Sequence, residues 1–376
     1  MKMNYNSSIY NLYYEWWKNI DKFIFSLIIL LFVTGLFFSL LSTSLLVSDK
    51  LDTNDYAFFF KHLSFVFLGL VIIFMLSSIN EEKLFKISPV IFIISLVFLF
   101  LVPIIGIEVN SAQRWIDLYL LPRFQPIELV KPFLIILISL ILSSEKYTNI
   151  YLKYFLSFLI TLIIVLFLAI QPDIGQTLLV LFIWSVLIFI SGINVIFLVA
   201  SGLIFSISFY FFINYVSKFA YIKNRILSFF NAETGTHNAQ SEKAIDSISS
   251  GGYFGKGIGE GTLKNRVPEA HTDYIISVIS EEFGVLAIIL ILLMFLIFVY
   301  SVFKKVYLVN EERIKLVLVG CISLILVQAM IHIGVNIRLF PTTGMTLPFI
   351  SYGGSSIISI SILSGIILNL TKRKIS

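Results

Sequence analysis

Long apolar runs fill this chain, and they constrain its fold more than any other feature. Several of the ten runs approach the roughly 20 residues that an α-helix needs to span the hydrocarbon core of a membrane. Hydrophobic residues make up 58% of the chain and charged residues only 13%, so a water-soluble fold could not cover its own surface. The runs are Phe23–Leu46, Phe58–Ser77, Ile87–Ile107, Leu129–Ser143, Tyr154–Ala169, Gly175–Ile190, Val195–Tyr215, Val285–Phe303, Leu316–Val335 and Ser355–Leu370.

These runs lack the alternation of a barrel strand, so they predict an all-α, polytopic membrane protein with about ten transmembrane helices. We interpret residues 1–376 as one membrane domain. A long, less apolar stretch at residues 216–280 separates the seventh run from the eighth. Because aromatic and apolar residues occur throughout this stretch, we expect it to fold against the membrane rather than to be a disordered loop.

Lysine and arginine predict the orientation. They gather in one set of connections and at both ends of the chain, and the opposite short loops hold few of them. The positive-inside rule therefore predicts a cytoplasmic segment at residues 1–22, a periplasmic loop at 216–280 and a cytoplasmic tail at 371–376. The first run is expected to be an anchor, since it is too long for the core of a signal peptide. The single cysteine, Cys321, is expected to pack in the core.

The first polar cluster follows the third run and contains Arg114, Trp115, Glu128 and Lys131. Glu128 and Lys131 are three residues apart at the start of a predicted helix, so they share a face and can pair. An ordinary capped loop with an interfacial tryptophan explains the same residues equally well.

The second cluster, residues 171–176, joins two apolar runs almost without a loop. Asp173 is therefore expected near the membrane edge, where acidic groups tend to be functional. It could equally serve as the N-cap of the next helix, and the two roles are compatible.

The third cluster combines glycines at 251–261 with Lys256 and with Glu269, His271 and Asp273. The glycine spacing is wrong for a dinucleotide fingerprint. Glycines can leave backbone N–H groups free for an anion, and with Lys256 this composition favours a diphosphate over a merely flexible loop. His271 and Asp273 could be general acid–base groups or metal ligands.

The fourth cluster, residues 341–356, includes Ser351 and Tyr352 and breaks the helical pattern at membrane depth. Two prolines and three glycines lie within it. Broken backbone at that depth is tolerated only inside protein or beside a cavity. We therefore expect a re-entrant segment; a plain loop is the weaker alternative, since its apolar residues would face water.

These clusters, in this order, resemble the SEDS family (shape, elongation, division and sporulation) over nearly the whole chain. Together they are highly specific, and Pro268–Asp273 and Gly344–Tyr352 resemble the cell-division members more than the elongation members. The Val130–Pro132 run resembles cell-division members of the alphaproteobacterial type. Ile127 departs from the family, which usually has Ser there. The matching pieces are Arg114–Ile116, Gln125–Lys131, Gln171–Gly175, Gln240–Ser241, Gly251–Gly261, Pro268–Asp273 and Ser351–Ser356.

The resemblance implies a peptidoglycan glycosyltransferase that polymerises lipid II at the division septum of the bacterial inner membrane. It implies a class B penicillin-binding protein as partner, other divisome proteins beside it, and no role for nucleic acid. The resemblance maps the catalytic aspartate onto Asp273. Substrate binding is expected at Arg114, Trp115, Glu128, Lys131, Asp173, Lys256, Glu269, His271, Ser351 and Tyr352.

Three alternatives stay open at this point: a lipid II flippase, the elongation-type polymerase, and a non-enzymatic divisome scaffold. The polar clusters are concentrated at the predicted outer side, which favours the enzyme over a flippase. A scaffold would not need Asp273. A divalent cation, Mg²⁺ or Mn²⁺, could assist at the diphosphate, although the sequence has no ligand cage.

Overall fold

The computed structural model describes residues 13–43, 56–109, 112–117, 122–216, 220–230, 236–263, 267 and 269–372. Within these ranges a helix corresponds to each of the ten apolar runs. Seven of them are long and apolar enough to cross a membrane, and α8 and α14 are shorter apolar helices. The prediction of an all-helical polytopic fold is therefore confirmed. The helices are α2 (Lys22–Thr43), α4 (Ala57–Ser78), α5 (Glu81–Ile105), α6 (Pro126–Leu142), α7 (Ile150–Ile170), α8 (Ile174–Ile190), α9 (Val195–Tyr215), α12 (Ile275–Val306), α13 (Glu312–Asn336) and α14 (Gly354–Leu370).

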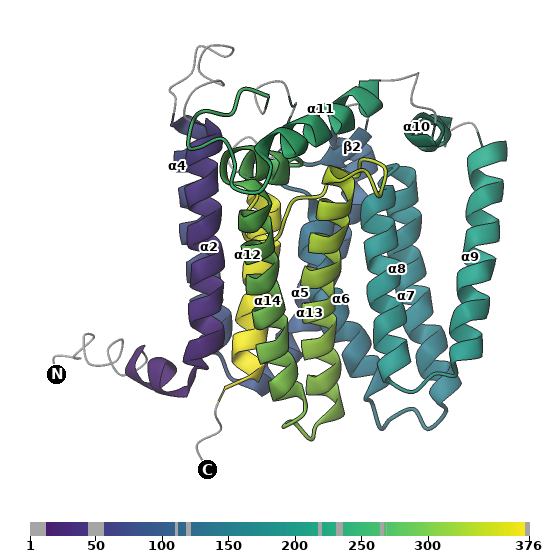
Figure 1. Cartoon of the computed structure of the whole chain (residues 1–376). Coiled ribbons are helices and arrows are strands. Elements are labelled where there is room, and N and C mark those ends of the chain that lie inside the picture. The colour runs from purple at the N-terminus through teal and green to yellow at the C-terminus, as the bar shows by residue number, and fades with distance from the viewer. Residues whose placement is uncertain are drawn as a thin grey trace.

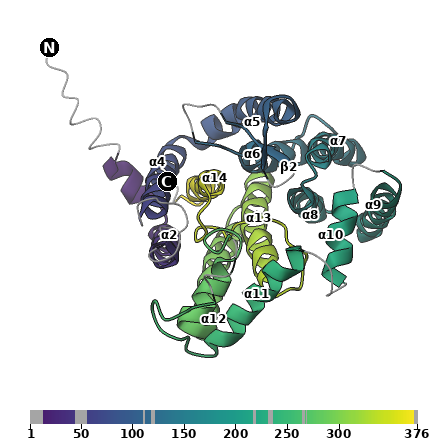
Figure 2. The same ribbon diagram turned by 90° about the horizontal axis from the view of Figure 1, so that it is seen from above.

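Helices α13 and α14 lie toward the middle of the bundle when it is seen from above (Figure 2). Helix α14 packs on α4, α6 and α13, while α13 also packs on α6, α8 and α12. Most side chains of both helices are buried. In contrast, α9 has no buried residue and stands at the edge of the bundle (Figure 1).

The two ends of the bundle differ in what covers them. Helix α2 begins and α14 ends at the lower end in Figure 1, whereas α10 (Ala220–Phe230) and α11 (Thr236–Gly251) cover the upper end. Helix α11 packs on α12 and α13. The two helices of this stretch, α10 and α11, therefore lie at the opposite end of the bundle from the start of α2 and the end of α14. Which end faces the cytoplasm stays a prediction.

Helix α12 begins earlier than the apolar run that predicted it, at Ile275 rather than Val285. Glu281 and Glu282 lie just before the run in the sequence, but both are buried within the helix. Gly284 then breaks the helical geometry with φ 76° and ψ −178°, values that favour glycine. A short helical piece therefore precedes the membrane span.

The segment between α13 and α14, residues 337–353, descends into the interior of the bundle. The Phe349 ring packs against Phe32 of α2 and Phe298 of α12, with ring centroids 5.1 Å and 5.9 Å away. Both partners lie near the middle of their helices. The segment is thus broken backbone enclosed by protein, as expected from its prolines and glycines.

A small hairpin that the sequence did not predict lies between α5 and α6. Strand β1 (Ile107–Val109) pairs antiparallel with β2 (Ala112–Trp115), and Trp115 lies opposite Ile107. An isolated bridge between Ile116 and Phe124 extends the pairing. The hairpin places Arg114 beside the turn between α7 and α8.

Candidate active site

Arg114 on β2 holds the turn between α7 and α8. Its Nη2 donates to the carbonyl of Pro172 at 2.6 Å and its Nε to that of Gln171 at 3.4 Å. Nε also lies 3.6 Å from Oδ2 of Asp173. The turn is strained, because Pro172 has φ 23°. Arg114 thus brings the first and second polar clusters together, and its side chain keeps 16% of its surface exposed.

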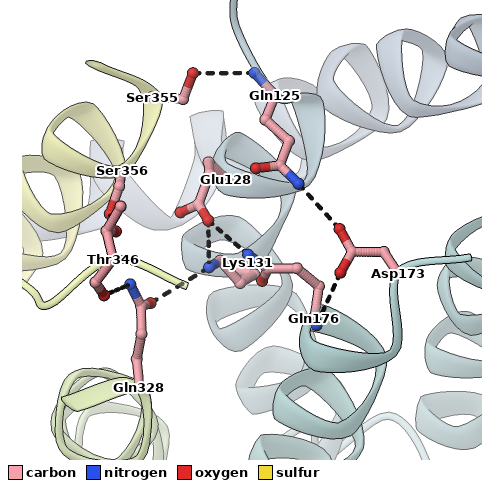
Figure 3. Close-up of polar contacts among 9 residues, drawn as sticks. All are labelled: Gln125, Glu128, Lys131, Asp173, Gln176, Gln328, Thr346, Ser355 and Ser356. Atoms are coloured by element: carbon pink, nitrogen blue, oxygen red, sulfur yellow. Dashed lines mark hydrogen bonds and ion pairs between the residues drawn. The ribbon is translucent and has the colours of Figure 1, made fainter. Parts of the chain in front are cut away.

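Asp173 is the N-cap of α8 and a centre of contacts between segments. Oδ1 accepts from the backbone N–H of Gln176 at 3.3 Å, and Oδ2 accepts from Nε2 of Gln125 at 3.1 Å (Figure 3). The backbone N–H of Gln125 donates in turn to Oγ of Ser355 at the start of α14. Asp173 therefore caps α8 and also lies beside Arg114, so the two roles expected from the sequence are compatible.

The predicted pair of Glu128 and Lys131 forms, and it is enclosed between helices. Nζ of Lys131 lies 2.8 Å from Oε1 of Glu128, and the two side chains are 0% and 5% exposed. Nε2 of Gln176 donates to the same oxygen at 2.9 Å, and Lys131 also donates to Oε1 of Gln328 at 3.4 Å (Figure 3). In the described part of the chain, Oε2 of Glu128 has no hydrogen-bond partner.

The re-entrant segment joins this network from the other side. Nε2 of Gln328 donates to the carbonyl of Thr346, and Oγ1 of Thr346 donates to Oγ of Ser356 at 2.6 Å. Further along, Oγ of Ser351 donates to the carbonyl of Thr272 at 2.7 Å. The fourth cluster therefore touches both the Lys131 network and the loop that carries Asp273.

Asp273 lies directly before α12, in a turn organised by Glu269. The Glu269 carbonyl accepts from the N–H groups of Thr272, Asp273 and Tyr274, and Glu269 itself has φ 54°, an uncommon value for a residue with a side chain. A Cβ built on Gly344 would lie 3.6 Å from Oδ2 of Asp273. The carboxylate therefore faces the re-entrant segment.

His271 and Tyr352 lie in a group of aromatic rings above this segment. The His271 ring is 6.1 Å from Tyr352 and 5.2 Å from Phe58 of α4, and the Tyr352 N–H donates to the His271 carbonyl. Burial lowers the pKa of His271, and the nearby Glu269 carboxylate partly opposes that shift. The lowered pKa favours the neutral imidazole.

Lys256 belongs to a different cluster. Its Nζ lies 3.1 Å from Oε1 of Glu281, and the same oxygen accepts from the N–H groups of Thr262 and Leu263 at 2.9 Å each. The glycine-rich loop at 251–261 therefore surrounds a carboxylate of the protein itself. The structure brings Arg114 and Lys131 into one network and places Lys256 in another.

Three polar residues of α13, together with Gln176, are parts of the site that the sequence analysis missed or did not use. Gln328 and His332 lie inside the apolar run Leu316–Val335, and Asn336 directly follows it. The signal was available: the three residues are four apart, the spacing of one helix face, and buried polar groups inside membrane helices tend to be functional.

Among the described residues, no group of three or more His, Cys, Asp or Glu side chains is placed to hold a metal ion. The carboxylates of Glu128 and Asp173 are engaged with Lys131 and Arg114. The described residues therefore form no preformed cage of protein ligands for the divalent cation, and no step is assigned to one.

The chain matches the family model described as "Cell cycle protein" (FtsW, RodA and SpoVE) over residues 21–375. A protein of Haemophilus influenzae named as a probable peptidoglycan glycosyltransferase FtsW is 31% identical, with 93% of this chain and 90% of the relative covered. A relative of the same name from Caulobacter vibrioides is 29% identical, covering 96% and 91%.

Two solved structures have a similar fold. A chain from a study titled "Structural coordination of polymerization and crosslinking by a peptidoglycan synthase complex" superposes with a TM-score of 0.78 at 25% identity, covering 94% of this chain and 97% of the other. The rod shape determining protein RodA of Thermus thermophilus gives a TM-score of 0.68 at 26% identity, covering 94% and 96%.

Proposed function

The chain belongs to the SEDS family of cell cycle proteins, and from this premise we infer that it is a peptidoglycan glycosyltransferase that polymerises lipid II into glycan strands. The observation that carries the inference is a continuous polar network at one end of an apolar bundle. It runs from Arg114 and Asp173 through Gln125 to Ser355, and from Glu128 and Lys131 through Gln328 to the re-entrant segment beside Asp273.

The reaction joins two sugars. The 4-hydroxyl of one lipid II attacks the anomeric carbon of the growing strand, a new glycosidic bond forms, and undecaprenyl diphosphate leaves with the electrons of the broken C–O bond. Asp273 takes the proton of the attacking hydroxyl as general base. Asp273 lies two residues before α12, and its Oδ2 would be 3.6 Å from a Cβ built on Gly344, so the proposed base faces the re-entrant segment.

The two cations of the network are unequal candidates for holding the diphosphate. Arg114 is partly exposed and can offer its guanidinium to an anion. Lys131 is fully enclosed by Glu128 and Gln328, so contact between its ammonium and a diphosphate requires one of these partners to move. Trp115, Glu269, His271, Ser351 and Tyr352 lie on the same side, where they could contact the sugars.

The relatives named FtsW support a role in division, and the peptidoglycan synthase complex supports a class B penicillin-binding protein as partner. We place the protein in the bacterial inner membrane at the division septum, with residues 216–280 outside. The elongation role is the runner-up, since RodA shares the fold.

A lipid II flippase is the alternative from a different class. Its charged groups must be reachable from each side in turn. Among the described residues, the Arg114–Asp173 and Glu128–Lys131 pairs lie at the starts of α6 and α8, toward the end covered by α11. The more exposed Lys305–Asp21 pair lies at the opposite end, where α2 begins. This placement favours chemistry at one face over transport.

Polymerisation of labelled lipid II by the full-length protein, purified with its transpeptidase partner, tests the proposal. We expect Asp273→Ala and Asp273→Asn to lose about 100- to 10,000-fold in rate, the usual contribution of a general base. Glu260→Gln, an exposed carboxylate of the glycine-rich loop, is the matched control and keeps its activity. Near-normal polymerisation by a well-folded Asp273→Asn protein would remove Asp273 as the base.

A further inference from the structure

Helix α13 carries a row of three buried polar side chains, Gln328, His332 and Asn336. They are 1%, 1% and 0% exposed. Successive members are four residues apart, so they form one stripe along the helix. We call this stripe the α13 ladder. Buried polar groups in a membrane helix are costly unless they are bonded, so their partners indicate what the ladder is for.

Each member contacts a backbone carbonyl that lies outside α13. Nε2 of Gln328 reaches Thr346 at 3.1 Å, Nδ1 of His332 reaches Met345 at 2.7 Å, and Nδ2 of Asn336 reaches Asp273 at 3.0 Å. A carbonyl can only accept, so His332 carries its proton on Nδ1. Gln328 must present its oxygen to the Lys131 ammonium, which leaves its NH₂ group for Thr346.

The carbonyls that the ladder holds belong to backbone without regular structure. Residues 341–347 are neither helix nor strand, so no backbone ladder fixes them. Their positions depend on side-chain donors. This is the stretch whose Gly344 faces the carboxylate of Asp273, and Asn336 holds the peptide of Asp273 itself.

We propose that Gln328, His332 and Asn336 are positioning residues that set Asp273 and the Gly344–Thr346 backbone in register with the Glu128–Lys131 pair. The ladder is attached to that pair through Gln328 and Lys131. One rigid helix thereby fixes the separation between the proposed base and the buried cation. The expected effect on polymerisation rests on the proposed function. The expected effect on the position of the re-entrant backbone rests on the hydrogen bonds alone.

The most informative variants are at His332. Asparagine and leucine have nearly the same shape, so comparing them separates loss of the hydrogen bond from loss of packing. Asparagine places an amide NH₂ where Nδ1 lies, whereas leucine places a methyl group there. We expect His332→Leu to lower kcat for lipid II polymerisation by about 10- to 100-fold, the usual effect of a small misplacement of reacting groups. KM should change little, and His332→Asn should recover most of the rate.

Asn336→Leu provides an independent variant, because it nearly keeps the size of the side chain but removes the donor to the Asp273 carbonyl. The control is Ser139→Ala in α6, which removes a buried hydroxyl that bonds only within its own helix. We expect the control to keep both kcat and KM. Equal losses in His332→Leu and His332→Asn, or a fall in kcat for Ser139→Ala as large as theirs, would overturn the proposal.

Hydrogen–deuterium exchange separates failure of the ladder from failure of the proposed function. We expect faster exchange in residues 341–353 of His332→Leu than in the wild type, with α6 unchanged. Unchanged exchange in 341–353 would overturn the ladder whatever the activity. Faster exchange in a protein whose wild type polymerises no lipid II would retain the ladder and overturn the proposed function.

Discussion

Glu128 and Glu281 are both buried glutamates that face a lysine, yet their surroundings differ. Glu281 is saturated: Oε1 accepts from Lys256, Thr262 and Leu263, and Oε2 accepts from Ser247. Glu128 uses Oε1 for Lys131 and Gln176. Its Oε2, among the described residues, has no partner.

We propose that the difference separates a structural carboxylate, Glu281, from one retained for function, Glu128. Full satisfaction ties the glycine-rich loop to α12, and this explains Glu281 without any substrate. An unsatisfied buried oxygen is unfavourable, so packing alone does not explain Glu128. Its position in the network that leads to Asp273 does.

The largest expected effect is at the Glu128–Lys131 pair. Removing one partner of a buried pair leaves a charge uncompensated and costs about 3–5 kcal/mol. We therefore expect Lys131→Met to lower the thermal stability and to abolish most polymerisation in detergent, where no flipping is required.

The double variant Glu128→Gln/Lys131→Met is the control for that loss. It removes both charges, so it should regain much of the stability while staying inactive. If the double variant regained activity as well as stability, the Glu128–Lys131 pair would be structural only, as Glu281 is. Full polymer yield in detergent by Lys131→Met, with lost translocation in vesicles, would favour the flippase.

A smaller effect is expected at Glu281, and on stability rather than on chemistry. Glu281→Gln keeps the size of the side chain but weakens hydrogen bonds to a charged acceptor, each worth about 1.5–3 kcal/mol. We expect a lower melting temperature and a nearly unchanged KM for lipid II below that temperature. A rise in KM with unchanged melting would place Glu281 in the site.

Lys256 should matter less still. Its side chain is 34% exposed, and ion pairs in that setting contribute about 0–1 kcal/mol. Glu281 keeps three donors when Lys256 is lost. We expect Lys256→Met to change neither the melting temperature nor KM by much. If Lys256 contacted the diphosphate, as the sequence predicted, Lys256→Met would clearly raise KM for lipid II.

The smallest effect on activity is expected for a cysteine introduced on α11 as a target for a thiol reagent. Ser249 is exposed, while Ser247, two residues earlier, is buried against Glu281. A cysteine at Ser249, in a Cys321→Ser background, should react with an impermeant thiol reagent added from outside and leave activity intact. Reaction only after the membrane is permeabilised would invert the predicted orientation.

The helices were predictable because their apolar runs are long and because the bilayer makes hydropathy a strong signal. The start of α12 was not, since Glu281 and Glu282 resemble loop residues until their partners are known. The β1–β2 hairpin is too short to leave a pattern. Its contact with the rest of the bundle, from Arg114 to the Pro172 carbonyl, joins residues 58 positions apart.

The site was predictable where spacing carries meaning. The i, i+3 spacing of Glu128 and Lys131 predicted a pair, and the pair forms. Lys256 could not be assigned because its partner, Glu281, lies 25 positions away. Gln328 and His332 were hidden inside an apolar run, and their role became clear only when the carbonyls of Met345 and Thr346 were located.

The enclosure of Phe349 between α2 and α12 has a consequence for biogenesis. A ribosome delivers α2 early and the re-entrant segment near the end of synthesis, so the contact between Phe32 and Phe349 closes after almost every other helix has entered the bilayer. Contacts between parts distant in sequence form late. Until then the surfaces of α2 and α12 that later contact Phe349 are exposed to lipid, and the incomplete bundle is accessible to quality-control proteases. Substitutions that enlarge or shrink Phe349 should therefore appear first as lowered abundance in the membrane.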